Sequence, residues 1–388
     1  MCALKNSEKF SAVTGIIAEF NPLHKGHEIL IRSQKKFGAC VVVLSSNFTQ
    51  RGSPAFIDKF LRAETAIKAG ADLVVELPFI FACSAAQDFS RGAVGILARM
   101  KFITHIAFGM EDPEFNFLPL LIEINSSENY KKFLHEELKR GASFSKAHSI
   151  ATEKILPGSH EFLSKPNNLL GVSYISELRR NNFDIAPFFI KREGIFKSRD
   201  IRENLEENFY MLPDFSREIL LYAKKNGRIC EEKNLWPLLQ NIFIRTSSED
   251  LRKIYGIDEG IENLFLKNWR GSKNLDDFIG RCVCARYTRS HIRRRLIYIL
   301  LGLNKFEALG ALRNTAPYAR VLAFNQTGRE LLKTFSKNSD IKFITRLKDS
   351  KSRTEKFFAG LELKASQLYE ILLKNPDMNR ELHKVLQF

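Results

Sequence analysis

The chain has 388 residues, enough for roughly two or three domains and for a core that needs no disulfides. Hydrophobic residues make up 44% and charged residues 27%, which excludes an intrinsically disordered chain. Lys and Arg number 60 and Asp and Glu 44, and the net charge of +16 favours a polyanionic partner.

Nothing in the sequence predicts export or a membrane anchor. The first hydrophobic run, 13–20, already contains Glu19, and the later runs are shorter than the roughly 18 residues of a membrane span. The 6 cysteines are scattered, which is typical of free thiols in a reducing compartment. Only Cys282 and Cys284 lie close together, and one such pair is poor zinc spacing. We expect a cytoplasmic protein with no membrane contact and no metal site built from its own side chains.

In the first half, short β-branched runs alternate with segments of helical spacing. The predicted strands are 13–19, 40–45, 73–77, 102–108 and 185–191, and the predicted helices are 27–36, 58–69 and 85–97. This alternation predicts a Rossmann-like α/β domain with a parallel sheet covered on both faces. Ligands bind such sheets at the carboxyl ends of the strands, so candidate site residues are sought there.

The second half differs in charge and in pattern. Residues 1–195 hold 24 Lys and Arg against 20 Asp and Glu, and residues 196–388 hold 36 against 24. The excess of positive charge therefore lies in the second half, where the spacing is almost only helical. We expect a catalytic, nucleotide-binding domain over 1–195 and a mainly helical, basic domain over 196–388.

The loop after the first strand has the composition of a phosphate-binding site. It carries an H-x-G-H signature, in which His24, Gly26 and His27 follow the turn made by Asn21 and Pro22. Gly26 permits close backbone approach, and the N–H groups at the start of the helix favour an anion. His24 and His27 add hydrogen-bond donors that would stabilise charge on a phosphate under attack. The alternative is a surface turn with two incidental histidines.

Beyond this loop, a series of segments resembles one family of H-x-G-H nucleotidyltransferases, the tRNA(Met) cytidine acetate ligases. The segments that carry the resemblance are 46–55, 58–59, 62–64, 72–78, 88–89, 92–94, 108–109 with Glu111, 165–171, 287–289, and 320–325 with Gly328. They extend over nearly the whole chain, and their joint order is more specific than the H-x-G-H signature alone.

The resemblance implies an enzyme that activates acetate with ATP as acetyl-AMP and transfers the acetyl group to the wobble cytidine of elongator tRNA(Met), giving N4-acetylcytidine. Mg²⁺ is expected to accompany ATP. The implied catalytic residues are His24 and His27. The implied ATP-binding residues are Ile17, Ala18, Glu19, Phe20, Asn21, Pro22, His24, Lys25, Gly26, His27, Gly109, Asn167, Arg192, Ser198 and Arg202. Glu19, Glu76 and Glu111 end strands, and a capping or solvated role is as good an explanation of them as a metal site.

A loop after the second strand is the candidate pocket for acetate or cytidine. Gln50 and Arg51 supply an amide and a guanidinium beside the backbone freedom of Gly52. The alternative is that Arg51 only pairs with Asp58 or Glu64 on the following helix, a surface contact worth about 0–1 kcal/mol.

One segment departs from the family pattern. Where members of the H-x-G-H nucleotidyltransferase superfamily have a serine- and threonine-rich stretch that grips the triphosphate, this chain has Lys-Ser-Arg-Asp-Ile-Arg over 197–202. Ser198 and Arg202 fit, Arg199 replaces a hydroxyl residue, and the link 193–196 from Arg192 is short. Cations can hold phosphate, but through charge more than through directed hydrogen bonds.

The helical half contains a candidate RNA-binding stripe. Arg286, Arg289 and Arg293 are predicted to share one helix face beside Tyr287, and no acidic residue lies between 281 and 295 to neutralise them. Arginines beside an aromatic ring suit phosphate contacts and stacking on an unpaired base. The alternative is a solvated charged face.

Two other functions stay open. H-x-G-H alone also permits an adenylyltransferase that joins ATP to a small phosphorylated metabolite, although such an enzyme would not need a large basic half. The altered 197–202 segment also permits a nucleotide- or RNA-binding relative without catalysis.

Overall fold

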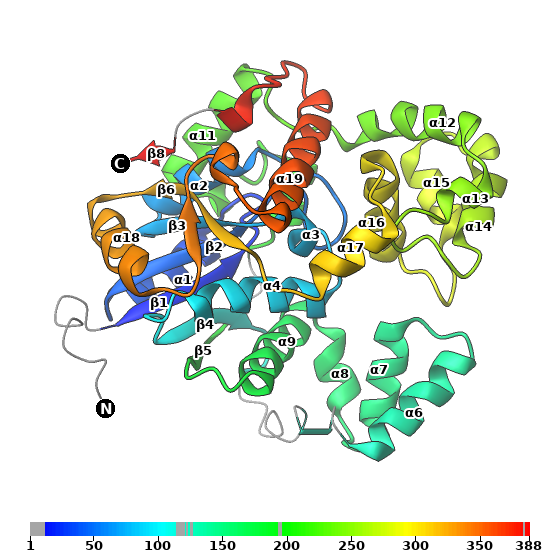
Figure 1. Cartoon of the computed structure of the whole chain (residues 1–388), viewed down its shortest axis with the longest axis horizontal. Coiled ribbons are helices and arrows are strands. Elements are labelled where there is room, and N and C mark those ends of the chain that lie inside the picture. The colour runs from blue at the N-terminus through cyan, green and yellow to red at the C-terminus, as the bar shows by residue number, and fades with distance from the viewer. Residues whose placement is uncertain (1–11, 114–120, 122, 125–126, 193–195, 383–384) are drawn as a thin grey trace.

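A computed structural model describes residues 12–113, 121, 123–124, 127–192, 196–382 and 385–388. A sheet lies at the centre, with helices on both of its faces and a group of helices, α12 to α15, at one side (Figure 1). The boundary predicted at residue 195 and the short link before residue 196 lie outside the described residues. No helix in the part of the chain described here is both long and apolar enough to cross a membrane.

The predicted parallel sheet is confirmed. β1 (Val13–Ala18), β2 (Ala39–Ser45), β3 (Leu73–Leu77), β4 (His105–Met110) and β5 (Ala186–Lys191) pair in parallel in the order β5-β4-β1-β2-β3. Every residue of β2 and β3 is buried, which explains why these strands are apolar runs in the sequence apart from Ser45 and Glu76.

Alternate residues of each strand point to opposite faces of the sheet and enter two different cores. On one face, Val42 and Leu44 pack with residues of α1 (Lys25–Lys35) and α2 (Lys59–Lys68). On the other, Val41 and Val43 pack with residues of α4 (Ala86–Arg99) and α9 (Pro166–Arg180). These layers bring the loops that follow β1, β2, β4 and β5 to one edge of the sheet.

The second half is mainly helical, but it also contributes strands to the sheet. β6 (Tyr318–Phe324) pairs antiparallel with β3, and β7 (Lys342–Ile344) and β8 (Leu386–Gln387) pair with β6. Residues from beyond 317 therefore extend the same sheet. Tyr318 and Arg320 interrupt the apolar pattern of β6, although both are buried.

The remaining elements are mostly helices. In chain order they are α3 (Phe79–Ala82), α6 (Glu128–Lys139), α7 (Phe144–Glu153), α8 (Ser159–Ser164), α10 (Ser198–Glu203), η1 (Phe209–Met211), α11 (Asp214–Lys225), η2 (Glu232–Asn234), α12 (Leu235–Arg245), α13 (Ser248–Leu251), α14 (Ile261–Asn268), η3 (Trp269–Gly271), α15 (Leu275–Cys282), α16 (Arg289–Leu301), α17 (Lys305–Leu312), α18 (Gln326–Asn338), η4 (Leu347–Asp349), α19 (Arg353–Ile371) and η5 (Arg380–Leu382).

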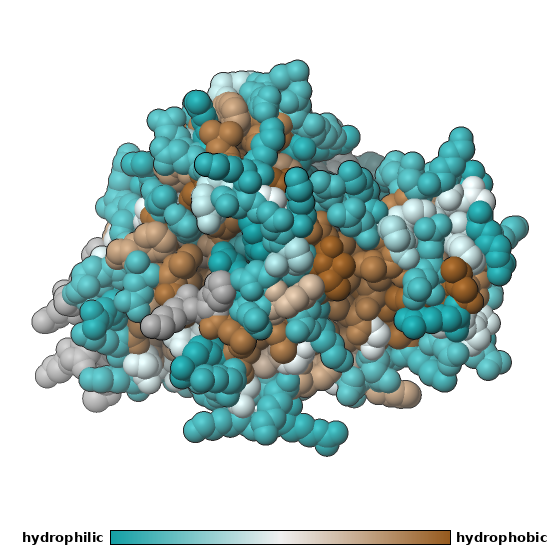
Figure 2. Space-filling model, turned by 90° about the horizontal axis from the view of Figure 1, so that it is seen from above, coloured by the Kyte–Doolittle hydropathy of each residue, from teal (hydrophilic) through white to brown (hydrophobic). Residues whose placement is uncertain are grey.

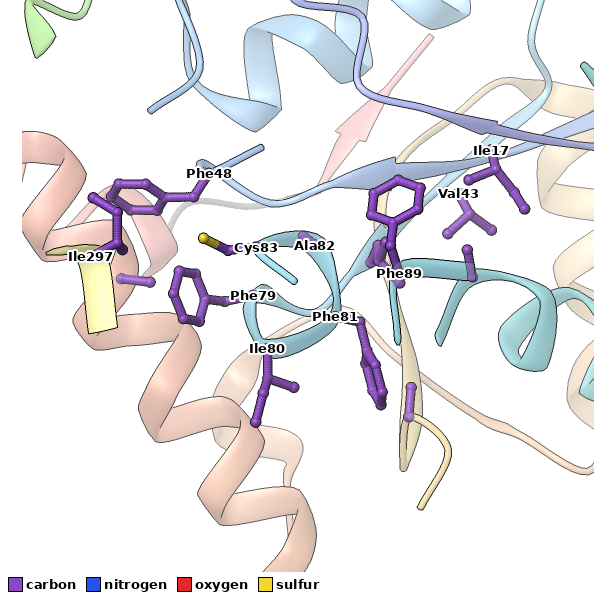
Figure 3. Close-up of a cluster of buried hydrophobic side chains, with 14 of the residues drawn as sticks. Ile17, Val43, Phe48, Phe79, Ile80, Phe81, Ala82, Cys83, Phe89 and Ile297 are labelled. Carbon is purple, nitrogen blue, oxygen red and sulfur yellow. The ribbon is translucent and has the colours of Figure 1, made fainter. Parts of the chain in front are cut away.

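α3 joins the helical part to the sheet. Phe79 packs edge-on against Phe48 at 5.7 Å between ring centroids, and Ile297 of α16 lies in the same cluster (Figure 3). The cluster continues through Phe89 to Val43 in the sheet (Figure 3). Most residues on the face seen in Figure 2 are hydrophilic, and the hydrophobic ones show in several separate patches.

A buried charge cluster ties the two halves together. Lys59 Nζ lies 2.8 Å from Glu362 Oε1 and 2.7 Å from Glu381 Oε1, and it also contacts Glu76. Arg320 pairs with Glu76 and Glu381, and no member of the cluster is more than 2% exposed. Glu76 is therefore a structural carboxylate here, since two cations of the fold already occupy it.

Candidate active site

The H-x-G-H residues lie at the carboxyl end of β1, where the first turn of α1 begins. Helix α1 starts at Lys25, two residues earlier than predicted, with His24 at its N-cap. The rings of His24 and His27 stack 3.7 Å apart with 16° between their planes. A Cβ at position 26 would lie 3.1 Å from His24 Cε1, so glycine leaves room for this ring.

Both imidazoles are neutral at pH 7. Burial, helped by the positive charge of Arg192, lowers the pKa of His24 to about 4. Burial also holds the pKa of His27 well below its ordinary value, with smaller contributions from His24 and Arg192. The backbone N–H of His24 donates to His27 Nδ1 over 3.3 Å, which places the proton of His27 on Nε2. Nδ1 of His24 is buried and has no hydrogen-bond partner among the described residues, as expected of an atom that hydrogen-bonds to a bound ligand.

The next group of candidates meets beside this pair. Arg192, directly after β5, donates from Nη1 to Asn167 Oδ1 over 3.3 Å. Asn167 Nδ2 donates to Glu111 Oε1 over 2.6 Å, and the N–H of Asn168 donates to Glu111 Oε2 over 3.0 Å. A Cβ at Gly109 would lie 2.9 Å from Arg192 Cγ, so glycine lets this arginine lie against β4. The structure therefore brings Gly109, Asn167 and Arg192 together.

The altered 197–202 segment holds the H-x-G-H loop in place. Ser198 Oγ donates to the carbonyl of Pro22 over 3.1 Å, and Arg202 Nη1 donates to the carbonyl of Asn21 over 2.5 Å. Arg199, the departure from the family pattern, is exposed and pairs with Glu203 at 2.7 Å.

One cavity of about 1490 Å³ runs past these groups. Of the ATP-binding candidates, Ile17, Ala18, Glu19, Phe20, Asn21, His24, His27, Gly109, Asn167, Arg192, Ser198 and Arg202 line it. Gly26 lines a smaller cavity of about 160 Å³ that shares His24, His27, Gly109 and Arg192. Pro22 is buried and Lys25 exposed, and neither lines these two cavities.

The loop after β2 lines the same cavity through Gln50 and Arg51. The N–H of Gln50 donates to Glu19 Oε1 over 2.7 Å, and its carbonyl accepts from Arg294 Nη1 over 3.0 Å. Gly52 has φ +80, and a Cβ there would lie 2.4 Å from the backbone N of Arg294. This loop is therefore pressed against α16.

The alternative that Arg51 pairs with Asp58 or Glu64 does not match the structure, because both acids have other partners. Asp58 is buried and pairs with Arg228 and Arg380, and Glu64 pairs with Lys68. Arg51 is exposed at the cavity instead.

The arginine stripe needs a correction. Arg286 lies in the bend before α16, so it does not share a helix face with Arg289 and Arg293, and of the three only the last two line the cavity. These arginines are also not free of acidic partners, because other elements supply carboxylates. Arg286 lies 3.8 Å from Glu259, Arg289 contacts Asp276, and Arg293 lies 3.3 Å from Glu232. Arg286 and Arg289 keep 47% and 49% of their side chains exposed, so a role in RNA binding stays a prediction.

The cavity also contains residues that sequence reasoning missed. Ser53, Glu232 and Asp276 line its far end, beside Arg293 of α16. No local motif marks them, because they come from three segments that only the fold brings together.

The carboxylates considered for a metal are held by the protein. Glu19 accepts from the backbone of Gln50, and Glu111 accepts from Asn167 and Asn168. Within the described residues there is no group of three or more His, Cys, Asp or Glu that could hold a metal ion.

Comparisons with known proteins agree with this geometry. The chain matches a family model described as HIGH Nucleotidyl Transferase over residues 11–384. It is 34% identical over 401 residues to a tRNA(Met) cytidine acetate ligase of Clostridium perfringens, covering 95% of this chain and 97% of the relative. A ligase of the same name from Caldanaerobacter subterraneus subsp. tengcongensis is 36% identical over 391 residues, covering 93% and 95%.

Solved structures point the same way. The crystal structure of Thermotoga maritima TmcAL bound with alpha-thio ATP superposes with a TM-score of 0.87 at 30% identity, covering 97% of this chain and 100% of that one. The apo form of the same protein gives a TM-score of 0.87 at 28% identity, with the same coverage. The chain therefore belongs to the HIGH nucleotidyl transferases and, among them, to the family of the tRNA(Met) cytidine acetate ligases.

Proposed function

We propose that this protein is an ATP-dependent ligase that activates acetate as acetyl-AMP and transfers the acetyl group to the wobble cytidine of elongator tRNA(Met). The observation that carries this proposal is the cavity of about 1490 Å³ that runs from the histidine pair to α16. It exceeds the roughly 300–1,000 Å³ of an ordinary small-molecule pocket, as a site for ATP, acetate and a base would.

In the first step, the carboxylate of acetate attacks the α-phosphorus of ATP and pyrophosphate leaves. Acetate is already ionised at neutral pH, so the site needs donors and positioning more than a base. The neutral rings of His24 and His27 each offer one N–H to the phosphates, and Arg192 supplies positive charge beside them. The Asn167–Glu111 contact fixes the direction of the Arg192 guanidinium.

The remaining ATP contacts are proposals of the same kind. Ser198 and Arg202 would act through the Asn21–Pro22 backbone that they hold, and Lys197 and Arg199 line the cavity as further cations. Mg²⁺ would arrive with the triphosphate, since Mg²⁺ is usually held by substrate phosphates, water and one or two carboxylates. It would neutralise charge on the leaving pyrophosphate.

Gln50 and Arg51 are proposed to form the acetate and cytidine pocket, and Arg286, Arg289 and Arg293 to contact tRNA. Residues 1–195 would carry the adenylation chemistry and residues 196–388 most of the tRNA contacts. A tRNA substrate would place the reaction in the cytoplasm.

ATP–pyrophosphate exchange tests the first step. We expect exchange that depends on acetate and that falls when His24→Asn is introduced. Exchange driven only by a small phosphorylated metabolite would instead support the adenylyltransferase, and no exchange with any acid would support a relative without catalysis. Lys36→Gln, an exposed change on the far end of α1, serves as the control variant.

A further inference from the structure

Glu232 stands out among the acids that line the cavity. Glu19 and Glu111 accept hydrogen bonds from neighbouring protein groups, and Glu203 is 60% exposed and pairs with Arg199. Asp276 is 74% exposed and contacts Arg289. Glu232, the first residue of η2, instead keeps Oε1 buried in an ion pair with Arg293, without a hydrogen bond of good geometry.

This carboxylate is nevertheless fixed in place. Its Oε1 lies 3.3 Å from Nη1 of Arg293, and the same Nη1 donates to Ser53 Oγ over 2.7 Å. Arg293 comes from α16 and Ser53 from the loop that contains Gln50 and Arg51. Glu232 is therefore held at the junction between the proposed acetate and cytidine pocket and the basic helix.

The second step of the proposed reaction needs a group of this kind. The exocyclic N4 of cytosine is a weak nucleophile that must lose a proton when it is acylated, and Glu or Asp is the side chain that accepts a hydrogen bond from this amine. A base that is held within reach of the departing proton contributes about 10²- to 10⁴-fold to a rate.

We propose that Glu232 receives the N4 amine of the target cytidine and is the general base of acetyl transfer, an inference that rests on the proposed function. N4 forms a bond to the acetyl carbonyl carbon, and the bond from that carbon to the phosphate oxygen breaks. AMP leaves with the electron pair, and one N4 proton passes to the Glu232 carboxylate, which later releases it to solvent.

The electrostatic surroundings suit a base. Burial raises the pKa of Glu232 above its ordinary value. The charges of Arg293 and Arg202 and a contact with Ser53 lower this pKa in part. Asp276 of α15 and Cys230 also face this group, Asp276 raising its pKa further. A raised pKa makes the carboxylate a stronger proton acceptor than an exposed glutamate.

The test uses Glu232→Gln in the full chain, because the amide oxygen can still lie beside the Arg293 guanidinium but cannot take a proton. We expect acetate-driven ATP–pyrophosphate exchange within twofold of wild type, which also verifies folding. Single-turnover transfer from preformed acetyl-AMP to tRNA(Met) should fall by about 100-fold or more. The wild-type transfer rate should rise with pH as Glu232 ionises, and the variant should lack this limb.

Glu231→Gln is the matched control, since Glu231 is the adjacent residue, undergoes the same change of charge and pairs with Lys233 at 2.8 Å. Its transfer rate should stay within twofold of wild type. Transfer by Glu232→Gln at the wild-type rate, or with the same pH limb, would overturn the inference while leaving the proposed function intact. If the wild-type chain makes acetyl-AMP but acetylates no tRNA, the proposed function fails and the inference fails with it.

Discussion

Replacing Lys59 by Met should destabilise the protein strongly, although Lys59 lies far from any ligand in the proposed mechanism. Its ammonium is fully buried and contacts three carboxylates, those of Glu76, Glu362 and Glu381. Methionine keeps most of the apolar stem but leaves these carboxylates with Arg320 as the remaining cation of the cluster. The loss is therefore that of an uncompensated buried charge rather than that of a cavity.

Removing one partner of a buried ion pair costs about 3–5 kcal/mol. With about 2.1 cal/mol/K of unfolding entropy per residue, a loss of about 4 kcal/mol lowers Tm by about 5 °C in a chain of 388 residues. Urea unfolding followed by far-UV circular dichroism, with a thermal melt beside it, measures both quantities.

Two further variants make the measurement decisive. Lys68→Met removes a half-exposed helix pair with Glu64 at 3.1 Å and should change stability by less than about 0.5 kcal/mol. Lys59→Met combined with Glu381→Met removes charge of both signs, because Glu381 is the ionised partner of Lys59, so the double variant should lose less than the sum of the single losses. A single Lys59→Met variant within about 1 kcal/mol of wild type would refute the reasoning.

Three further predictions concern the site and the charges. His24→Asn and His27→Asn should each lower acetate-driven exchange by about 100-fold or more while tRNA affinity in a filter-binding assay stays within twofold; a collapse of tRNA affinity would contradict the role given to this loop. The double change Arg286→Gln with Arg289→Gln should weaken tRNA binding and leave exchange unchanged. The slope of log affinity against log salt concentration should become shallower by about one unit per lost phosphate contact. An unaltered slope would show that these arginines form a solvated charged face and do not contact tRNA. Burial and Glu76 raise the pKa of Glu362 to about 8, so the folded state holds a proton that the unfolded state releases. The stability gained from this bound proton is complete below the ordinary pKa of 4.5 and is lost as pH rises through about 8. In thermal melts, the stability of wild type relative to Glu362→Gln should therefore fall between pH 5 and 8. A stability difference that does not change with pH would contradict this prediction.

The sheet could be predicted from the sequence because its strands are buried on both faces. Leu73–Leu77 and Ala39–Ser45 are short, mostly apolar runs between turn residues, and the candidate loop of Gln50 and Arg51 follows the second of them. The H-x-G-H loop was visible for a similar reason, since the donors and the glycine that it needs are adjacent in the chain. β6 was missed because Tyr318 and Arg320 look polar until the fold buries them.

The far end of the cavity could not be predicted, because its contacts join residues distant in the sequence. Arg293 meets Glu232, 61 residues earlier, and Ser53, 240 residues earlier. The arginines of the 281–295 segment are an example, because that segment contains no acidic residue of its own. Glu259 and Asp276 become partners of Arg286 and Arg289 only through the packing around α16. The composition predicts that the second half is positively charged, but only the structure shows which of its arginines are exposed.

Acetylation of tRNA tests the central claim most directly. The purified chain is incubated with ATP, Mg²⁺, labelled acetate and unmodified elongator tRNA(Met), and the digested nucleosides are analysed by mass spectrometry. The account predicts labelled N4-acetylcytidine that requires ATP and disappears when the wobble cytidine is replaced by uridine. Acetate-driven exchange without labelled N4-acetylcytidine, or label that persists in the uridine transcript, would contradict it.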